Sequence, residues 1–225
     1  MRYAIYYLPP SDSALWRFGC SVIGYDSVSG QQVEHCLRGF DMQTLTSEPA
    51  RYGFHATLKA PFYLCEALSE GDLITSVAAF ARNQTPLDMG CLELKRIGGF
   101  IALTPKSTQS SLCEFAGLCV QAFDVFRNPM TEDERRRRMM ADLSPRQQTY
   151  LELWGYPYVM EEFRFHMTLT DSLPEDILEP VTQVLRQIYQ PIDIAHRIEE
   201  ISLCAQSQPN ERFREIMRFT LGSQT

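Results

Sequence analysis

Two segments of the chain alternate between polar and apolar side chains, and both carry the same five-residue pattern. Residues 54–58 read Phe-His-Ala-Thr-Leu, and residues 165–169 read Phe-His-Met-Thr-Leu. Successive side chains of a β-strand point to opposite faces of its sheet, so the alternation predicts strands over residues 51–59 and 159–170. In each predicted strand, the histidine and threonine share a polar face, while the phenylalanine and leucine share an apolar face.

Apolar spacing and turn residues predict the remaining elements. A run rich in tyrosine and isoleucine predicts a strand over residues 2–8 that ends at Pro9. Ser11 or Ser13 is expected to cap the helix that follows, whereas residues 31–50 have no clean period and predict a loop. Further helices are predicted over about residues 69–84, 108–126, 145–154 and 174–188, and one more begins at Thr131. Further strands are predicted over about residues 90–97, 100–104, 192–204 and 213–221.

The order of motif strand, helix, strand and strand occurs twice along the chain. Two such halves are each too small to cover their own sheet, so they are expected to pack as a pseudo-symmetric pair. The predicted fold class is α+β and bilobal, with two antiparallel sheets facing a central cleft and helices outside. The expected lobes cover about residues 1–105 and 159–225, with a mostly helical insert over 106–158.

Composition narrows the class of protein. The chain has 225 residues, 44% of them hydrophobic and 22% charged, as is ordinary for a globular protein. Its net charge of −7 argues against a general nucleic-acid binder. Seven cysteines without a Cys-x-x-Cys pair indicate reduced thiols in a cytoplasmic protein. No apolar stretch is long enough to span a bilayer, so no membrane partner is expected, and the oligomeric state stays open.

The two polar faces carry groups suited to a phosphodiester. Two facing histidines can hold different protonation states near neutral pH, so one of His55 and His166 can accept a proton while the other donates one. The hydroxyls of Thr57 and Thr168 can donate to the non-bridging oxygens of the same phosphate. A lone strand histidine is usually structural, but the repeat at one offset favours catalysis here.

Three cations and two aromatic residues lie near the motifs. Arg51, Lys59 and Arg164 share the polar faces and are candidate phosphate ligands. For Arg51 and Lys59, a purely solvated role at a strand end is the alternative. Tyr52 and Tyr158 are candidates for stacking on a sugar or base, with a core role as the alternative.

Other conspicuous residues favour structural interpretations. His35 and His196 have no motif around them. The run Arg135–Arg138 follows three acidic residues and points in all directions around a helix, which predicts a solvated helix, with a contact to a second phosphate as the alternative. His-x-Thr is a poor metal motif, because threonine is not a typical ligand and no carboxylate shares these faces. We expect neither a metal nor another cofactor.

The duplicated motif resembles the two-histidine (2H) phosphoesterase superfamily, whose hallmark is a repeated His-x-Thr/Ser on strands that flank a cleft. Residues 51–62 and 154–170 are similar to the two motif regions of a branch encoded with carbon–phosphorus lyase operons for phosphonate use. Residues 14–16 and 98–100 also match that branch, so the resemblance spans most of the chain.

This resemblance implies an enzyme that hydrolyses or transfers a phosphodiester, often a cyclic one. His55 and His166 would be the acid and base, and Thr57 and Thr168 would bind the phosphoryl oxygens. The operon context of similar proteins implies a small phosphorylated metabolite, such as 5-phosphoribosyl 1,2-cyclic phosphate. The alternatives are a 2′,3′-cyclic phosphodiesterase or ligase acting on RNA ends, and a non-catalytic protein that binds a phosphorylated ligand. Which histidine is the acid, and which ester bond opens, stays undecided.

Overall fold

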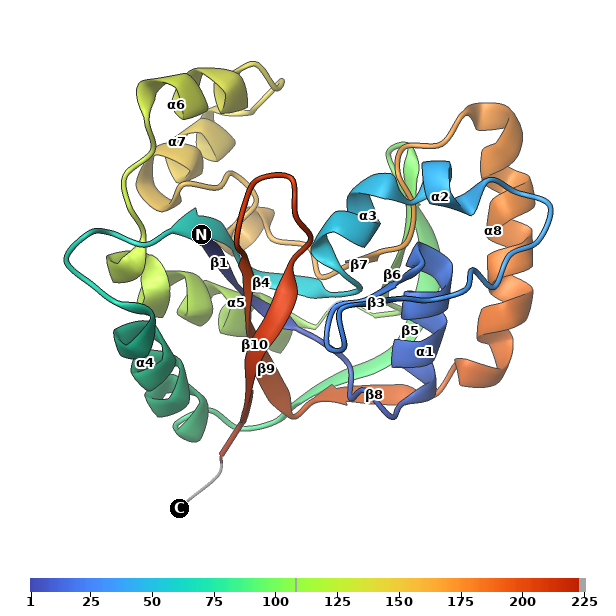
Figure 1. Ribbon diagram of the computed structural model, residues 1–225, viewed down its shortest axis with the longest axis horizontal. Coiled ribbons are helices and arrows are strands. Elements are labelled where there is room, and N and C mark those ends of the chain that lie inside the picture. The colour runs from blue at the N-terminus through green and yellow to red at the C-terminus, as the bar shows by residue number, and fades with distance from the viewer. Residues whose placement is uncertain (108, 223–225) are drawn as a thin grey trace.

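A curled antiparallel sheet forms the centre of the structure, a computed structural model that describes residues 1–107 and 109–222 (Figure 1). In these residues the sheet has eight strands in the order β10-β9-β1-β4-β7-β6-β5-β8. Its strands are β1 (Arg2–Tyr7), β4 (Ala56–Tyr63), β5 (Leu87–Ile97), β6 (Phe100–Pro105), β7 (Met167–Thr168), β8 (Ala195–Ile198), β9 (Glu200–Gln206) and β10 (Arg214–Thr220). A separate pair joins β2 (Tyr25–Asp26) to β3 (Gln31–Gln32).

The sheet consists of two halves that meet at its middle. The halves are β10-β9-β1-β4 and β7-β6-β5-β8, and a single register pair, Ala56 with Met167, joins them. The α+β, pseudo-two-fold fold is therefore confirmed, with the two expected sheets continuous along β4 and β7. The chain crosses between the halves, because β5 and β6 lie with the second motif while β9 and β10 lie with the first. The expected lobe boundaries thus follow chain order, whereas each half sheet takes strands from both lobes.

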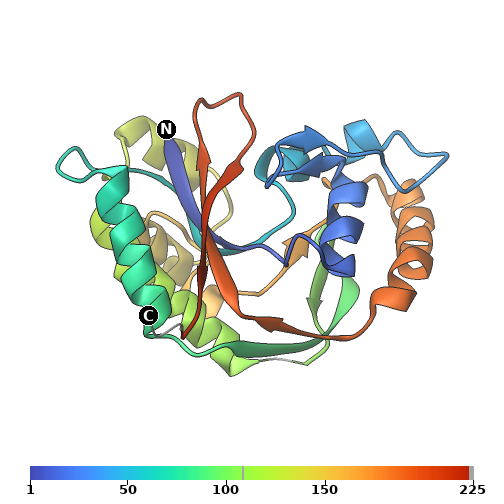
Figure 2. The ribbon, with the colours of Figure 1, turned by 60° about the horizontal axis from the view of Figure 1, so that its bottom comes forward.

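Helices cover the outside of the curled sheet, with α4 and α5 beside one half and α1 and α8 beside the other (Figure 2). Their starts follow local capping chemistry: Ser13 accepts a hydrogen bond from the backbone of Trp16, and Ser69 and Ser144 each form a capping box. The helices are α1 (Ala14–Ile23), α2 (Met42–Leu45), α3 (Ser47–Tyr52), α4 (Glu70–Arg82), α5 (Ser110–Phe123), α6 (Glu132–Met139), α7 (Pro145–Trp154) and α8 (Glu175–Tyr189), with 3-10 turns at Asp124–Phe126, Met160–Glu162 and Gln190–Ile192.

The first motif strand begins later than predicted. Residues 47–52 form α3, inside the expected loop and strand, and β4 begins only at Ala56. Gly53 ends the helix with a positive φ of 81°, and its N–H donates to the carbonyl of Pro49. Pro61, expected to end the strand, lies inside β4 next to an irregularity in its pairing with β1, where a missing N–H is tolerated.

The second motif strand is much shorter than predicted. Only Met167 and Thr168 pair in β7, and residues 160–162 form a 3-10 turn. The predicted alternation is nevertheless confirmed in the burial of the side chains, because Phe163, Phe165 and Met167 are all buried. The alternating sequence therefore predicted correctly which side chains are buried, but it did not predict how few of these residues form hydrogen bonds to a neighbouring strand. The helix predicted over residues 108–126 starts at Thr108, which lies outside the described residues.

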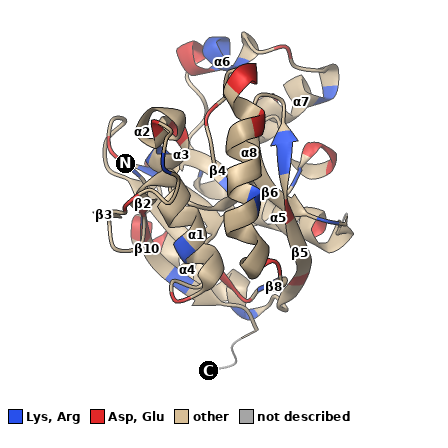
Figure 3. Ribbon diagram, turned by 90° about the vertical axis from the view of Figure 1, so that its right-hand side faces the viewer, with Lys and Arg blue, Asp and Glu red and all other residues tan. Residues whose placement is uncertain are grey.

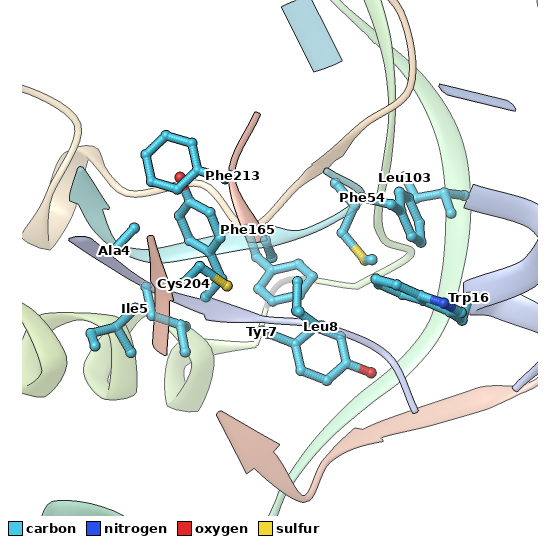
Figure 4. Close-up of a cluster of buried hydrophobic side chains, with 14 of the residues drawn as sticks. Ala4, Ile5, Tyr7, Leu8, Trp16, Phe54, Leu103, Phe165, Cys204 and Phe213 are labelled. Atoms are coloured by element: carbon cyan, nitrogen blue, oxygen red, sulfur yellow. The ribbon is translucent and has the colours of Figure 1, made fainter. Parts of the chain in front are cut away.

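The apolar faces of both motifs belong to the main core. Phe54 and Phe165 are buried with residues from β1, α1, β6 and β9 (Figure 4). Gly19 on α1 makes this packing possible, because a Cβ at this position would lie 2.0 Å from the ring of Phe54. In the described part of the chain, no helix combines the length and apolar character needed to cross a membrane.

Candidate active site

The two motif histidines line one cavity of about 370 Å³, which we call the site cavity. The two rings are held in the same way: Nδ1 of His55 lies 2.8 Å from the carbonyl oxygen of Gly53, and Nδ1 of His166 lies 2.7 Å from that of Arg164. Because a carbonyl only accepts, Nδ1 carries the proton in both rings. Nε2 is therefore the nitrogen available to a ligand, and in His55 it lies 3.2 Å from the hydroxyl oxygen of Thr57.

The two motifs meet about a local two-fold axis. Ala56 and Met167, the central residues of the two His-x-Thr triplets, are antiparallel register partners. This register turns His55 toward Thr168 and His166 toward Thr57, and all four of these residues line the site cavity. Each histidine is thus combined with the threonine of the other copy as well as its own.

Burial keeps the imidazole of His55 in its neutral form. Burial lowers its pKa to about 4, helped by the charge of His166 and opposed by the hydrogen bond to Gly53. The ring of Tyr6 stacks on His55 with 3.8 Å between centroids and 26° between planes. At neutral pH, His55 therefore presents an unprotonated Nε2 to the cavity.

A bulge in β4 removes Lys59 from the cavity face. Tyr6 pairs with Thr57 and Ile5 pairs with Lys59, so Leu58 is an extra residue on β4 between these two pairs. A one-residue bulge reverses the side-chain alternation beyond it. Lys59 therefore faces away from the cavity, which Ala60 lines in its place.

Lys59 is instead part of a buried ion pair. Its side chain is 3% exposed, and Nζ lies 2.9 Å from Oδ1 of Asp124 and 3.2 Å from the carbonyl oxygen of Val120. Arg127 binds the same carboxylate at 2.8 Å. The structure gives this predicted phosphate ligand a structural role under the sheet.

The other two predicted cations also lie outside the site cavity. Arg51 is on α3, where its guanidinium donates to the carbonyl of Pro209 and lies 3.8 Å from the carboxylate of Glu48. The guanidinium of Arg164 donates to the carbonyls of Glu161 and Phe163, both at 2.8 Å. Neither side chain is part of the lining that the two histidines share, although Arg164 lines the adjoining hollow with His166.

Of the two candidate stacking residues, one lines the site cavity. The ring of Tyr52 lies 6.3 Å from that of His55 and stacks on Phe213 at 5.5 Å. Tyr158 is 45% exposed and packs edge-on against Tyr156, with 5.6 Å between centroids. Contact of either ring with a substrate stays a prediction.

A second, larger hollow adjoins the site cavity, and we call it the apolar chamber. Its volume is about 590 Å³, and it shares Thr57, Ala60, Tyr156 and His166 with the site cavity. The rest of its lining is mostly apolar and comes from β4, β5, β6, α5, α7 and the segment before the second motif: Leu58, Ile97, Phe100, Ala116, Val120, Gln147, Tyr158, Val159, Met160, Glu162, Phe163 and Arg164. The chamber extends the site beyond His166.

Three cavity residues were not identified from the sequence, namely Arg2, Tyr6 and Tyr156, and a fourth, Arg138, belongs to the run for which a phosphate contact was only the alternative. The alternation of residues 2–8 did contain a signal, since Arg2 and Tyr6 share one face of β1. The arginine run gave no sign of which member would reach a site, because its four members look alike in sequence. Arg135–Arg137 are exposed, as expected for a solvated helix, whereas Arg138 is half-buried and faces the cavity; α6 carries both signs of charge (Figure 3).

Comparison with known proteins places the chain in a family. Residues 57–214 match the family described as "Protein of unknown function (DUF1045)". The chain belongs to the DUF1045 family. In both copies, its histidine and threonine lie at one cavity, as the resemblance to the 2H phosphoesterases implies.

This DUF1045 chain is also similar to longer curated proteins. It is 33% identical over 232 residues to "Ribose 1,5-bisphosphate phosphokinase PhnN" of Janthinobacterium sp. (strain Marseille), covering 99% of this chain and 51% of that protein. It is 34% identical over 200 residues to the protein of the same name from Laribacter hongkongensis (strain HLHK9), covering 86% and 47%. The chain therefore spans about half the length of the curated relatives it matches.

Among solved structures, the DUF1045 chain is similar to E. coli LigT. The apo form gives a TM-score of 0.47 at 14% identity, and the complex with 3′-AMP gives 0.46 at 16% identity. Both alignments cover 99% of this chain and 98% of LigT.

The lining of the DUF1045 site cavity is suited to an anion. It combines two imidazoles, two threonine hydroxyls, three phenols and two guanidinium groups, and it includes no carboxylate. Within residues 1–107 and 109–222, no group of three or more histidine, cysteine, aspartate or glutamate side chains is placed to hold a metal ion. The site offers a base, hydroxyl donors and positive charge around one small volume.

Proposed function

We propose that this DUF1045 chain hydrolyses a small cyclic phosphodiester, with His55 as the general base and His166 as the general acid. One observation carries the proposal: the two His-x-Thr motifs meet at one cavity through the register pair Ala56–Met167. That geometry supplies two proton-transfer groups and two hydroxyl donors around a single phosphate.

The two histidines divide the proton transfers between them. Neutral His55 accepts a proton on Nε2 from the attacking water, whose oxygen forms the new bond to phosphorus. One ring P–O bond breaks, and the departing oxygen takes a proton from Nε2 of His166. The product is a phosphomonoester with a free neighbouring hydroxyl, and exchange with solvent resets both rings. The low pKa of His55, which leaves Nε2 unprotonated at neutral pH, supports its part as the base.

The threonines stabilise the charge that grows on the phosphoryl group. Thr57 and Thr168 donate hydroxyl hydrogen bonds to the two non-bridging oxygens, one from each strand. Donors held in place before the reaction need no rearrangement as the charge develops. No step of this mechanism passes through a metal, so a chelator is expected to leave the rate unchanged.

The proposed substrate is 5-phosphoribosyl 1,2-cyclic phosphate. The curated relatives, about twice as long, are named for a phosphorylated ribose. The resemblance to the phosphonate-operon branch points to the same metabolite. A net charge of −7 and a cavity of about 370 Å³ favour a small anion over a long RNA.

A nucleoside 2′,3′-cyclic phosphate is a second candidate, favoured by the apolar chamber. The chamber adjoins His166 and carries Tyr156 and Tyr158 on its lining. An aromatic base could stack there while its cyclic phosphate occupies the site cavity.

Phosphorus NMR of the products tests the reaction and the substrate together. The panel holds 5-phosphoribosyl 1,2-cyclic phosphate, 2′,3′-cyclic nucleotides and an RNA ending in a cyclic phosphate, each with and without chelator. We expect turnover of the ribosyl compound, and the product resonance identifies the ester bond that opens. The double variant His55→Ala/His166→Ala is the control. Wild-type protein that turns over none of these compounds would refute the proposal.

The pH profile of kcat/KM tests the assignment of the base. Because kcat/KM reports the free enzyme, and the pKa of His55 is about 4, we expect activity to persist well below pH 6 and to fall with one proton as the pH drops through about 4. Circular dichroism at each pH separates this fall from unfolding. An acid limb near pH 6.5, the ordinary histidine value, would contradict the assignment.

A further inference from the structure

The site cavity contains more positive charge than a phosphodiester requires. The proposed reaction uses the two histidines and the two threonines, which already supply donors for both non-bridging oxygens. Arg2 and Arg138 line the same cavity in addition, and no carboxylate belongs to the lining. A diester phosphate has a single negative charge, so the guanidinium of Arg2 is left without an assigned anion, and Arg138, which pairs with Glu134, adds further donors.

Arg2 is held in place without being neutralised. Its Nε and Nη2 atoms lie 2.8 and 2.5 Å from Oε1 of Gln206, which is an uncharged amide. Among the described residues, the ion pairs do not include Arg2. Its guanidinium also lies over the ring of Phe213, 5.4 Å from the centroid. These contacts orient the group and leave its charge available to a ligand.

Arg138 reaches the cavity from the α6–α7 segment, which lies beside the N-terminal end of β1 (Figures 1 and 2). Its Nη1 donates to the carbonyl of Gly155 at 2.6 Å, and its Nη2 lies 2.7 Å from the carboxylate of Glu134. Side chains held at two points keep a guanidinium in one orientation, which favours specific recognition of an oxyanion. The two arginines thus come from elements far apart in the sequence.

Tyr6 supplies an independent sign of a missing ligand. Its side chain is 1% exposed and lines the site cavity, and its hydroxyl is buried without a hydrogen-bond partner. Buried hydroxyls are nearly always paired in native proteins. Burial also raises the pKa of Tyr6, against the opposing charge of Arg2, so the hydroxyl keeps its proton and can donate. An oxygen of a bound anion would satisfy it.

We infer that Arg2, Tyr6 and Arg138 form a second anion site, which binds a phosphomonoester carried by the cyclic substrate. This inference rests on the proposed function for the position of the diester at the histidines. A phosphomonoester is a dianion near neutral pH with three free oxygens. The unpaired charge of Arg2, the remaining donors of Arg138 and the phenol of Tyr6 are suited to such a group. The second site would make the enzyme select cyclic diesters that carry another phosphate.

Paired substrates test the selectivity. We compare 5-phosphoribosyl 1,2-cyclic phosphate with ribose 1,2-cyclic phosphate, which lacks the second phosphate. In Arg2→Gln and Arg138→Gln, we expect KM for the phosphorylated compound to rise about tenfold or more, with little change for the other. Arg137→Gln, an exposed neighbour on the same helix, is the matched control. Equal losses on both substrates would overturn the inference, because the arginines would then act on the diester.

A binding experiment keeps the test independent of turnover. Calorimetry measures ribose 5-phosphate, which has no diester, binding to the His55→Ala/His166→Ala protein with and without Arg2→Gln/Arg138→Gln. Binding that the arginine changes abolish supports the second site even if no cyclic substrate is hydrolysed. Absent binding, or binding that ignores both arginines, overturns it. If the proposed function alone is wrong, this experiment still succeeds while the substrate panel fails.

Tyr6→Phe separates recognition from structure. The change removes only the unpaired hydroxyl and keeps the ring against His55. We expect the free protein to unfold at the same or a higher temperature, while ribose 5-phosphate binds more weakly. Lost binding together with lost stability would indicate a structural role instead, and unchanged binding would remove Tyr6 from the site.

Discussion

Alanine at His55 or at His166 lowers kcat for the cyclic phosphodiester by about 10²- to 10⁴-fold, the range typical for loss of a general acid or base. Each variant keeps one of the two histidines and both threonines. The phosphate is therefore still bound, and KM changes much less than kcat. Initial rates measured over a range of substrate concentrations, with circular dichroism to verify the fold, check this result.

His35 provides a matched control for these two variants. It lies outside the site cavity, and its Nδ1 lies 2.9 Å from the carbonyl oxygen of Val22. His35→Ala is expected to keep the wild-type kcat. A single variant of either motif histidine with undiminished kcat would remove that residue from the mechanism.

The Asp124→Asn variant is destabilised by about 3–5 kcal/mol, the usual effect of removing one partner of a buried ion pair. The side chain of Lys59 is 3% exposed and that of Asp124 is 21% exposed, so the ammonium would stay in the interior without its carboxylate. Arg127 loses the same partner. Urea unfolding gives the free energy directly, and a change below about 1 kcal/mol would show that the pair is replaced by other contacts.

The pH dependence of the free energy of unfolding tests the contribution of the Asp124 carboxylate in a second way. Burial raises the pKa of Asp124, but hydrogen bonds from Arg127 and Lys59 outweigh it and leave the pKa below the ordinary value of 3.8. A lowered pKa in the folded state contributes stability above the unfolded-state pKa and loses it as the pH falls. Wild-type stability should therefore decline below about pH 4 more steeply than that of Asp124→Asn. Asp133→Asn, whose carboxylate is exposed, should follow the wild type.

Much of this fold was readable from the sequence, because the signals were local. Alternation of polar and apolar residues correctly separated the core phenylalanines Phe54 and Phe165 from the histidines beside them. The sequence offered Ser11 or Ser13 as the cap of α1, of which Ser13 is the cap in the structure, and predicted that α7 begins at Pro145. Both signals are local, because a capping hydrogen bond involves residues only three apart. The duplicated motif indicated pseudo-symmetry, which the register pair between β4 and β7 confirms.

The sequence was a poorer guide to which strands pair with one another in the sheet. The strand predicted over 159–170 pairs only at Met167–Thr168, since pairing depends on which other strand lies alongside. β5 and β6 joined the second motif instead of the first for the same reason. In both cases, the residues that determine the pairing lie far along the chain from the strand that is paired.

The sequence by itself determined the two His-x-Thr motifs, the faces on which they lie and the helices that begin at capping residues, because each depends on neighbours within a few positions. Only the tertiary structure decided which cations reach the site. A bulge opposite β1 turned Lys59 toward Asp124, and the packing of α6 selected Arg138 from four arginines of identical type. The direction and the partner of a charged side chain depend on segments that meet only when the chain folds.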